Sequence, residues 1–432
     1  MKIHPLITTT QALTELCERL AKAPFVTVDT EFMRENTFWP ELCLIQIADE
    51  NEAAAVDPLA PGIDMTPLLD LMVNNEDVLK VFHAGGQDVE IIYNLTGKTP
   101  YPIFDTQIAM MAVSQAEQIG YSNLVESWLG MSVDKGARFT DWSRRPLTDR
   151  QIEYAIGDVT HLSTIFPKLL RKLRKTGRGA WLDIEMERLA DPENYRSDVD
   201  KAWLRIKAPS RNPAVLGRLK AIAGWREREA MDKNIPRGRM MRDETIADIA
   251  SHPPRDQSEL AKVRGLSTGW KDNDIGRRLM AVLAAAKPMT EAEMPPRAPR
   301  GAPLGKEGAL VADLLKLLLK IRAREIDIAA RLLARSDDLE ALAAGQRKGV
   351  AILEGWRMDV FGRDALDLVE GRLAFAVVRG KLKMAHIDDI GSNGDAGDDL
   401  PVAHVDLADG PTVADYDDAP LLVADDNAAG EG

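Results

Sequence analysis

The sequence is poor in cysteine and aromatic residues and has no long apolar run. Its 432 residues include only two cysteines, Cys17 and Cys43, which are too few for a disulfide framework or a thiolate zinc site. No segment reaches the roughly 18 apolar residues of a membrane span, and the N-terminus lacks the apolar stretch of a signal peptide. We therefore expect a soluble cytoplasmic protein without a membrane partner, long enough for about three domains.

Basic residues are missing from the end of the chain. Residues 387–432 contain 13 Asp and Glu and no Lys or Arg, which predicts an acidic disordered tail. Residues 1–193 carry 29 acidic and 18 basic residues, whereas residues 194–300 carry 14 acidic and 22 basic residues. A basic module can supply phosphate contacts to a nucleic acid. An ordinary solvated surface explains so small an excess equally well.

The pattern of apolar residues and breakers predicts three domains before the tail. Residues 1–193 alternate strand-like and helix-like segments, which predicts a mixed α/β domain with strands near residues 25–31, 42–48, 53–56 and 78–84. Residues 211–290 and 304–384 each have helical periodicity throughout. The two helical units have similar lengths and could be a diverged repeat, and a proline-rich linker separates them.

Two carboxylates, Asp29 and Glu31, close the first strong strand pattern. In a strand, side chains at i and i+2 share a face, so these carboxylates would project together at the end of a buried strand. Buried acids are costly unless they are paired or bind a metal. This pair therefore needs compensation from elsewhere in the chain.

Three further residues could complete such a site. Asp88 follows a Gly-Gly break after the fourth predicted strand, and Tyr154 and Asp158 lie four residues apart in a long predicted helix. Four carboxylates and a tyrosine suit hard ions such as Mg²⁺ or Mn²⁺, two of which can support an in-line phosphoryl displacement. Each residue taken singly has a simpler explanation. Asp88 could be a first-turn helix acid, Tyr154 a half-buried aromatic ring and Asp158 a solvated helix acid. Only together do they predict nuclease chemistry.

The sequence around these positions resembles the ribonuclease D family, in the DEDDy branch of 3′→5′ exonucleases. The three matching motifs are Val28-Asp29-Thr30-Glu31-Phe32, His83-Ala84-Gly85-Gly86-Gln87-Asp88 and Tyr154-Ala155-Ile156-Gly157-Asp158. The resemblance implies a ribonuclease H-like α/β exonuclease domain with a mixed sheet. It also implies that two divalent ions, Mg or Mn, bind Asp29, Glu31, Asp88 and Asp158, and that Tyr154 orients the attacking water. Gly157 is a departure, because alanine is expected there, and it costs the helix about 1 kcal/mol.

The helical units also resemble parts of this family. Residues 211–290 resemble the HRDC domain, a nucleic-acid-binding module, through Gly224–Glu229 and Ile235–Arg237. Gly355–Arg357 with Phe361 and Gly362 resembles a weaker second HRDC-like domain, so we expect two all-α HRDC-type domains. Candidate RNA contacts are Trp142, Arg144, Arg145, Arg226, Arg237 and Arg264. A core position for Trp142 is equally plausible, and each arginine could have a surface role only.

We therefore predict a metal-dependent 3′→5′ exoribonuclease that releases 5′-mononucleotides from structured RNA, with tRNA precursors as the expected substrate. The protein is expected to act as a monomer without a protein partner. Two alternatives stay open at this point. A DNA 3′→5′ exonuclease in repair would need the same acidic site, because none of its residues distinguishes the sugar. A catalytically silent nucleic-acid-binding protein is disfavoured because all five site residues are present.

Overall fold

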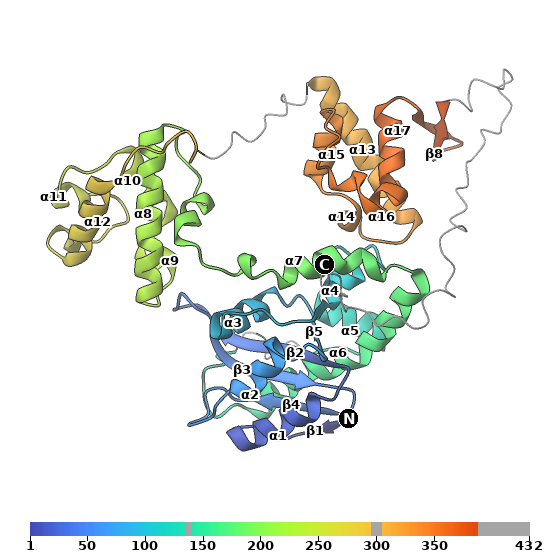
Figure 1. Ribbon diagram of the computed structural model, residues 1–432, viewed down its shortest axis with the longest axis horizontal. Coiled ribbons are helices and arrows are strands. Elements are labelled where there is room, and N and C mark those ends of the chain that lie inside the picture. The colour runs from blue at the N-terminus through green and yellow to red at the C-terminus, as the bar shows by residue number, and fades with distance from the viewer. Residues whose placement is uncertain (135, 137, 139, 295–304, 388–432) are drawn as a thin grey trace, which may run out of the picture. The chain divides into compact units, whose positions relative to one another are not determined.

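The computed structural model describes residues 1–134, 136, 138, 140–294 and 305–387 (Figure 1). The predicted acidic tail lies outside these residues, apart from Ile387. The described residues fall into two compact units. One takes its residues from Met1–Ile103, Asp134–Ser163 and Arg188–Ala298, and the other from Phe104–Val133, Thr164–Glu187 and Pro299–Gly432. The predicted domain 1–193 thus contributes to both units, and its boundaries stay a prediction.

A six-stranded mixed sheet forms the framework of the first unit. The strands lie in the order β1-β4-β3-β2-β5-β6, and their bounds are β1 Lys2–Ile3, β2 Phe25–Met33, β3 Glu41–Ala48, β4 Glu52–Val56, β5 Leu79–Phe82 and β6 Ile103–Asp105. Strand β2 is antiparallel to β3 and parallel to β5. The predicted mixed α/β fold is confirmed, and the strand that carries Asp29 and Glu31 lies inside the sheet.

Helices cover both faces of this sheet. Helices α1 (Thr10–Leu20), α2 (Thr66–Val73) and α3 (Gly86–Thr96) share an apolar core with Val26 and Val28 of β2. Helix α6 (Asp149–Thr176) packs its early turns on the opposite face, in a core that includes Leu44 and Ala48 of β3. Successive residues of β2 therefore point alternately toward these two layers.

The start of α6 is fixed by a reciprocal cap. The Thr148 backbone N–H donates to Gln151 Oε1 at 3.0 Å, and the Gln151 backbone N–H donates to Thr148 Oγ1 at 3.3 Å. These two reciprocal bonds form a capping box. Tyr154 and Asp158 therefore lie on the second and third turns of a helix with a defined start.

The first helical domain belongs to the same unit as the sheet. It contains α8 Pro213–Asp232, α9 Arg237–Met240, α10 Asp243–Ser251, α11 Gln257–Leu260 and α12 Asp274–Ala285. Gly217 of α8 must be glycine, because a Cβ atom there would lie 1.9 Å from the Lys287 carbonyl oxygen. The Asn234 Oδ1 atom accepts backbone N–H bonds from Phe38 at 3.0 Å and Trp39 at 3.1 Å. This domain is thereby attached to the connection between β2 and β3.

The second unit contains the remaining helices and a small hairpin. They are α4 Thr106–Met110, α5 Tyr121–Leu129, α7 Asp183–Ala190 (whose last residues belong to the first unit), α13 Lys306–Glu325, α14 Ala330–Leu333, α15 Ser336–Ala343, α16 Gly355–Arg357 and α17 Arg363–Val369, followed by β7 Leu373–Val378 and β8 Lys381–His386. Within this unit, the Trp181 and Trp356 rings stack with centroids 4.2 Å apart. Short 3-10 segments occur in both units. In the first unit they lie at Pro192–Asn194, Val199–Arg205 and Thr268–Lys271, and in the second at Gly179–Leu182 and Ala351–Leu353, where a π-helical turn also spans Met358–Gly362.

The hairpin corrects the expectation that residues 304–384 are entirely helical. Strands β7 and β8 pair in antiparallel fashion, and Val378 lies opposite Lys381. The two connecting residues, Arg379 and Gly380, both have positive φ angles, 50° and 76°. A two-residue turn with this backbone matches the twist of antiparallel strands. The β-branched and aromatic residues before it favour a strand, a signal that the helical pattern upstream obscured.

Candidate metal centre and active site

Three carboxylates converge at the end of β2. Asp29 and Glu31 come from β2 and Asp158 comes from α6, and one ligand oxygen of each lies within 4.8 Å of the others. Asp158 is buried, whereas Asp29 and Glu31 are half-buried. The cluster is therefore only partly shielded from solvent. The i, i+2 spacing on β2 brings two acids to the α6 face, as the sequence predicts.

Asp88 reaches the end of β2 from the other layer. It lies in the first turn of α3 and is 8% exposed. Thr30, between the two clustered acids, points away from them, and its hydroxyl donates a hydrogen bond to Asp88 Oδ1. Asp88 is not among the three clustered carboxylates, but its charge helps to raise the pKa of Glu31. Asp88 therefore lies beside the cluster and adds its negative charge to the electrostatics of the site.

Local backbone geometry brings Asp88 to this position. The chain turns sharply between β5 and α3, where Ala84 has a positive φ of 57°. At Gly85 a Cβ atom would lie 2.5 Å from the Cβ atom of Phe82, so any side chain would force the turn open. The Gly-Gly break in the sequence therefore corresponds to a real steric requirement at its first glycine.

The three clustered acids destabilise each other's charges. Burial raises the pKa of Glu31 to about 9, with further contributions from Asp29, Asp158 and Asp88. Burial also raises the pKa of Asp158 to about 7, although a hydrogen bond from the Tyr154 hydroxyl opposes the shift. The pKa of Asp29 lies well above its usual value because of burial and the Asp158 charge. Oxygen ligands that repel one another without a counter-charge fit a hard divalent cation.

Tyr154 lies beside these carboxylates with a fixed ring. Burial and the charges of Asp158, Glu31 and Asp29 raise the pKa of its hydroxyl, so the phenol stays protonated at neutral pH. Its ring packs near Trp142, with centroids 6.2 Å apart and planes 36° from parallel. Trp142 is only 2% exposed. Of the two explanations for Trp142, its burial favours the core position, where it packs against Tyr154, and its role as an RNA contact stays a prediction.

Arg138 is a residue near the site that sequence reasoning missed. Its charge lowers the pKa values of Glu31, Tyr154 and Asp158, and its side chain is exposed. The signal available in the sequence is a basic residue shortly before Trp142 and Arg144, two of the predicted RNA contacts. Because the Arg138 guanidinium acts electrostatically on the acids and faces solvent, it is well placed for a substrate phosphate.

Three of the five predicted arginine contacts are used inside the protein. Arg145 binds Asp57 through Nε at 2.7 Å and Nη2 at 2.6 Å. Arg226 is 3% exposed and donates to the Met241 carbonyl oxygen. Arg237 donates through Nε to Glu227 Oε2 at 2.7 Å and lies over the Phe38 ring at 4.2 Å. These three side chains stabilise the fold.

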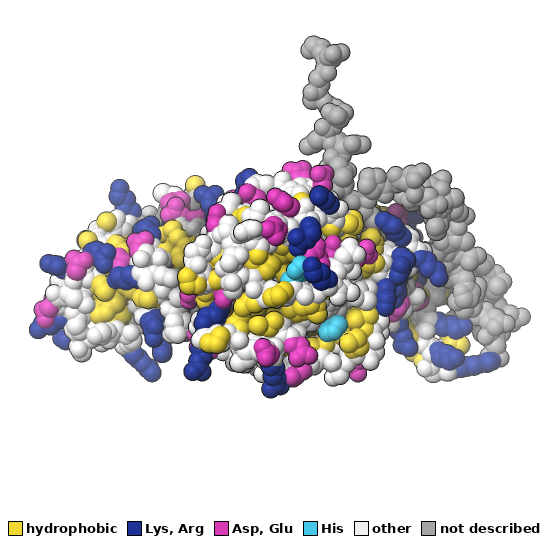
Figure 2. Space-filling view, turned by 90° about the horizontal axis from the view of Figure 1, so that it is seen from below, with side chains coloured by type: hydrophobic (Ala, Val, Ile, Leu, Met, Phe, Trp, Pro, Cys, Tyr) yellow, Lys and Arg dark blue, Asp and Glu magenta, His cyan; other side chains and the backbone are white. Residues whose placement is uncertain are grey.

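The other two predicted arginines, Arg144 and Arg264, are exposed. Figure 2 shows that basic and acidic side chains are interspersed over one face of the molecule. Charge alone therefore does not locate an RNA-binding surface there. Arg144 and Arg264 stay predictions as RNA contacts.

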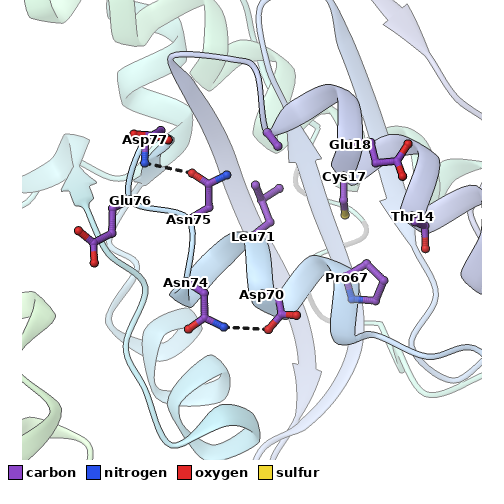
Figure 3. Close-up of a pocket in the computed structure, with 11 residues that line it drawn as sticks. Thr14, Cys17, Glu18, Pro67, Asp70, Leu71, Asn74, Asn75, Glu76 and Asp77 are labelled. Atoms are coloured by element: carbon purple, nitrogen blue, oxygen red, sulfur yellow. Dashed lines mark hydrogen bonds between the residues drawn. The ribbon is translucent and has the colours of Figure 1, made fainter.

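A separate cleft of about 520 Å³ lies between α1 and α2. Figure 3 shows Asn74 bonded to Asp70, and the Asp77 backbone N–H bonded to Asn75, along its edge. Its lining residues are Thr14, Cys17, Glu18, Ala21, Pro67, Asp70, Leu71, Asn74, Asn75, Glu76 and Asp77. None of the five site residues lines this cleft, so it takes no part in the chemistry of the carboxylate cluster.

The sheet, the acids from β2, α3 and α6, and the Tyr154 hydroxyl define a 3′→5′ exonuclease of the DEDDy class. Residues 5–174 match the family model for a 3′-5′ exonuclease, and residues 215–283 match the HRDC domain. The chain belongs to the ribonuclease D family. It is 68% identical to Ribonuclease D of Sphingobium indicum over 384 residues, which cover 89% of this chain and 99% of that protein.

Further similarities agree with this assignment. Ribonuclease D of Zymomonas mobilis is 62% identical over 388 residues, covering 90% of this chain and 100% of that protein. The crystal structure of Escherichia coli RNase D superposes with a TM-score of 0.69 at 28% identity, covering 85% of this chain and 99% of that one. The predicted family, a metal-dependent 3′→5′ exoribonuclease, is confirmed, and RNA is its substrate. One HRDC domain is confirmed, and the second HRDC-type domain stays a prediction.

None of the described helices is long and apolar enough to cross a bilayer.

Proposed function

We propose that this exoribonuclease removes 5′-mononucleotides from the 3′ ends of structured RNAs, tRNA precursors among them, with two divalent ions, Mg or Mn. The observation that carries the proposal is the cluster of Asp29, Glu31 and Asp158. The E. coli relative is described as an exoribonuclease involved in structured RNA processing, which supports the substrate class. A cytoplasmic location and a monomeric state also belong to this proposal.

The side chains have distinct roles in this mechanism. Asp29, Glu31 and Asp158 supply oxygen ligands on the α6 side, and Asp88 adds one from the α3 side. When bound, two divalent ions would activate the attacking water and stabilise the leaving oxygen. Tyr154 stays protonated, so its hydroxyl orients the attacking water by hydrogen bonding and does not act as a general base. Arg138 offers a guanidinium to the phosphate.

The experiment that tests this proposal compares product release from matched substrates. A 5′-labelled tRNA precursor and a DNA of the same sequence are incubated with Mg²⁺, with Mn²⁺ and with EDTA. We expect stepwise 3′ shortening of the RNA with either ion and none with EDTA. Faster shortening of the DNA would favour the alternative of a DNA exonuclease in repair.

Asp29→Asn is the control for the site itself. We expect it to lower the rate about 10³-fold or more, since it removes a ligand whose effect is largest in the transition state, and to leave RNA binding close to that of the wild type. If the wild type released no nucleotides while both proteins bound RNA equally, the mechanism would be wrong.

A further inference from the structure

Gln46 is a completely buried amide that lies next to the metal centre. It is 0% exposed and lies on β3. The strand register places it directly opposite Asp29 of β2. Neither its Nε2 nor its Oε1 atom has a hydrogen-bond partner among the residues that the structure describes. Buried polar atoms of this kind are rare in native proteins, and each needs a physical explanation.

The side chains around Gln46 do not supply that explanation. On its own strand, Leu44 and Ala48 share its face, and Ala55 of β4 lies directly opposite it. These three residues belong to the apolar core that α6 covers with Ala155. An amide in such surroundings loses its bonds to water and gains none from its neighbours.

Asp29 is the polar side chain directly opposite Gln46, and Thr27 and Glu31 lie diagonally on the same face. Residues directly opposite each other in an antiparallel pair share a face, with Cβ atoms about 4.5–5.5 Å apart. The glutamine side chain is long enough to cover that separation through one water. A carboxylate that binds a metal with one oxygen keeps lone pairs available for a neighbouring N–H donor.

We propose that Gln46 is a positioning residue of the metal centre. A single buried water links the two side chains: it accepts from Gln46 Nε2–H, donates to the Asp29 carboxylate and to Gln46 Oε1, and so fixes the orientation of the carboxylate. Partners of metal ligands typically change metal affinity or activity by about 10–100-fold. This inference rests on the proposed role of Asp29 as a metal ligand.

The decisive test separates metal affinity from stability in Gln46→Met, which keeps the shape of the side chain and removes its polar atoms. Mn²⁺ binding to the full-length protein is followed by the electron paramagnetic resonance signal of free Mn²⁺. Thermal unfolding is measured in EDTA. We expect Mn²⁺ to bind about 10-fold more weakly, while the unfolding midpoint without metal stays the same or rises, because an apolar side chain suits the apolar core around position 46.

Two results would overturn the proposal. One is an Mn²⁺ affinity of Gln46→Met within twofold of the wild type. The other is a loss of affinity in both Gln46→Met and Gln46→Leu that follows a parallel fall in the midpoint without metal, because that pattern means a purely structural role. Failure of either variant to fold belongs to this second result, because it also means a structural role.

Two control variants complete the experiment. Asn94→Leu removes another buried amide nitrogen that lacks a partner, six residues beyond Asp88 on α3, and its Mn²⁺ affinity should equal that of the wild type. Asp29→Asn separates this inference from the proposed function. If Asp29→Asn loses Mn²⁺ while Gln46→Met keeps it, only the role of Gln46 is wrong. If Asp29→Asn itself binds Mn²⁺ normally, the metal site is wrong.

Discussion

The acidic site at the end of β2 and the Arg237–Glu227 pair of the first helical domain show opposite arrangements of charge. In the site, Asp29, Glu31 and Asp158 lie together, and burial and neighbouring acidic charges raise the pKa values of Asp29 and Glu31. In the helical domain, Arg237 is paired with Glu227, which is 1% exposed. Like charges held together indicate a ligand that is still to bind. Opposite charges already joined indicate architecture.

Replacing Arg237 tests the paired charges of the helical domain and should cause the largest loss of stability. Arg237→Ala would leave the buried Glu227 carboxylate with the longer contact from Arg205, at 3.5 Å, and would remove the contact with Phe38. Breaking a buried pair destabilises a protein by about 3–5 kcal/mol, and the remaining Arg205 and the partial exposure of Arg237 place the expected loss near the lower end of that range. Urea unfolding should show this loss, whereas the RNA affinity of the folded fraction should change little.

Arg264→Ala is the matched control for that experiment. Arg264 is exposed, so its replacement should leave stability within about 0.5 kcal/mol. If Arg264 contacts phosphate, the slope of log affinity against log salt should become shallower by about 1. An Arg237→Ala protein that is as stable as the wild type but binds RNA poorly would reverse the assignment of the two arginines.

Replacing Thr30 tests the acidic half of the comparison. Thr30→Val keeps the shape of the side chain but removes the hydroxyl that donates to Asp88. A lost partner of a metal ligand should lower activity and metal affinity by about 10–100-fold. Thr30→Ser restores the hydroxyl and should recover most of both. Equal losses in the serine and valine variants would mean that packing, and not the hydrogen bond, matters at this position.

The stability of the metal-free protein should depend on pH in an unusual direction. Glu31 has a pKa near 9 in the folded state because of burial and three acidic neighbours, so from about pH 4.5 upward the folded state holds more protons than the unfolded state. The free energy of unfolding in EDTA should therefore fall as pH rises toward 9. The effect is moderated by solvent, because Glu31 is only half-buried.

Mg²⁺ should flatten this dependence, because the bound ion stabilises the charged carboxylates. Urea unfolding at several pH values, with EDTA and with Mg²⁺, measures both slopes, and Asp29→Asn in EDTA should show a smaller one. A free energy of unfolding that rises with pH in EDTA would contradict the repulsion between these acids.

The smallest effect is expected at Gly157, between Tyr154 and Asp158. A Cβ atom there would approach His161 Cε1 to 3.4 Å, which the ring can accommodate. Gly157→Ala should therefore stabilise α6 by at most about 1 kcal/mol, from helix propensity. Thermal unfolding measures the gain, and unchanged exonuclease activity would confirm that the ligand set is intact. A loss of stability would mean that the His161 ring cannot move.

The sequence predicts those parts of the site that depend on local spacing. Asp29 and Glu31 share a face because strands have a period of two, and Tyr154 and Asp158 share one because helices bring i and i+4 together. The cap at Thr148 is equally local. Each of these features involves residues within a few positions of one another, so the sequence pattern determines it directly.

The missed features depend on which segments meet. Gln46 matters only because β3 pairs with β2 in a particular register, and Thr30 matters because α3 brings Asp88 to the opposite face. Arg226 and Arg237 look like phosphate ligands in the sequence, because the sequence does not show that Arg226 is buried or that Arg237 pairs with the buried Glu227. The β7–β8 hairpin was missed because a short strand pair after several helices has few residues to reveal its period.

The side chains of β2 alternate between two layers, and this alternation restricts insertions and deletions within the strand. Thr27, Asp29 and Glu31 face α6, and Val26, Val28 and Thr30 face α1 to α3. Inserting or deleting a single codon within this strand would exchange the two sets. The carboxylates would enter the apolar layer, and the valines would take their places beside Asp158. Substitutions in β2 change one contact, whereas a one-codon length change would remove the fold and the site together.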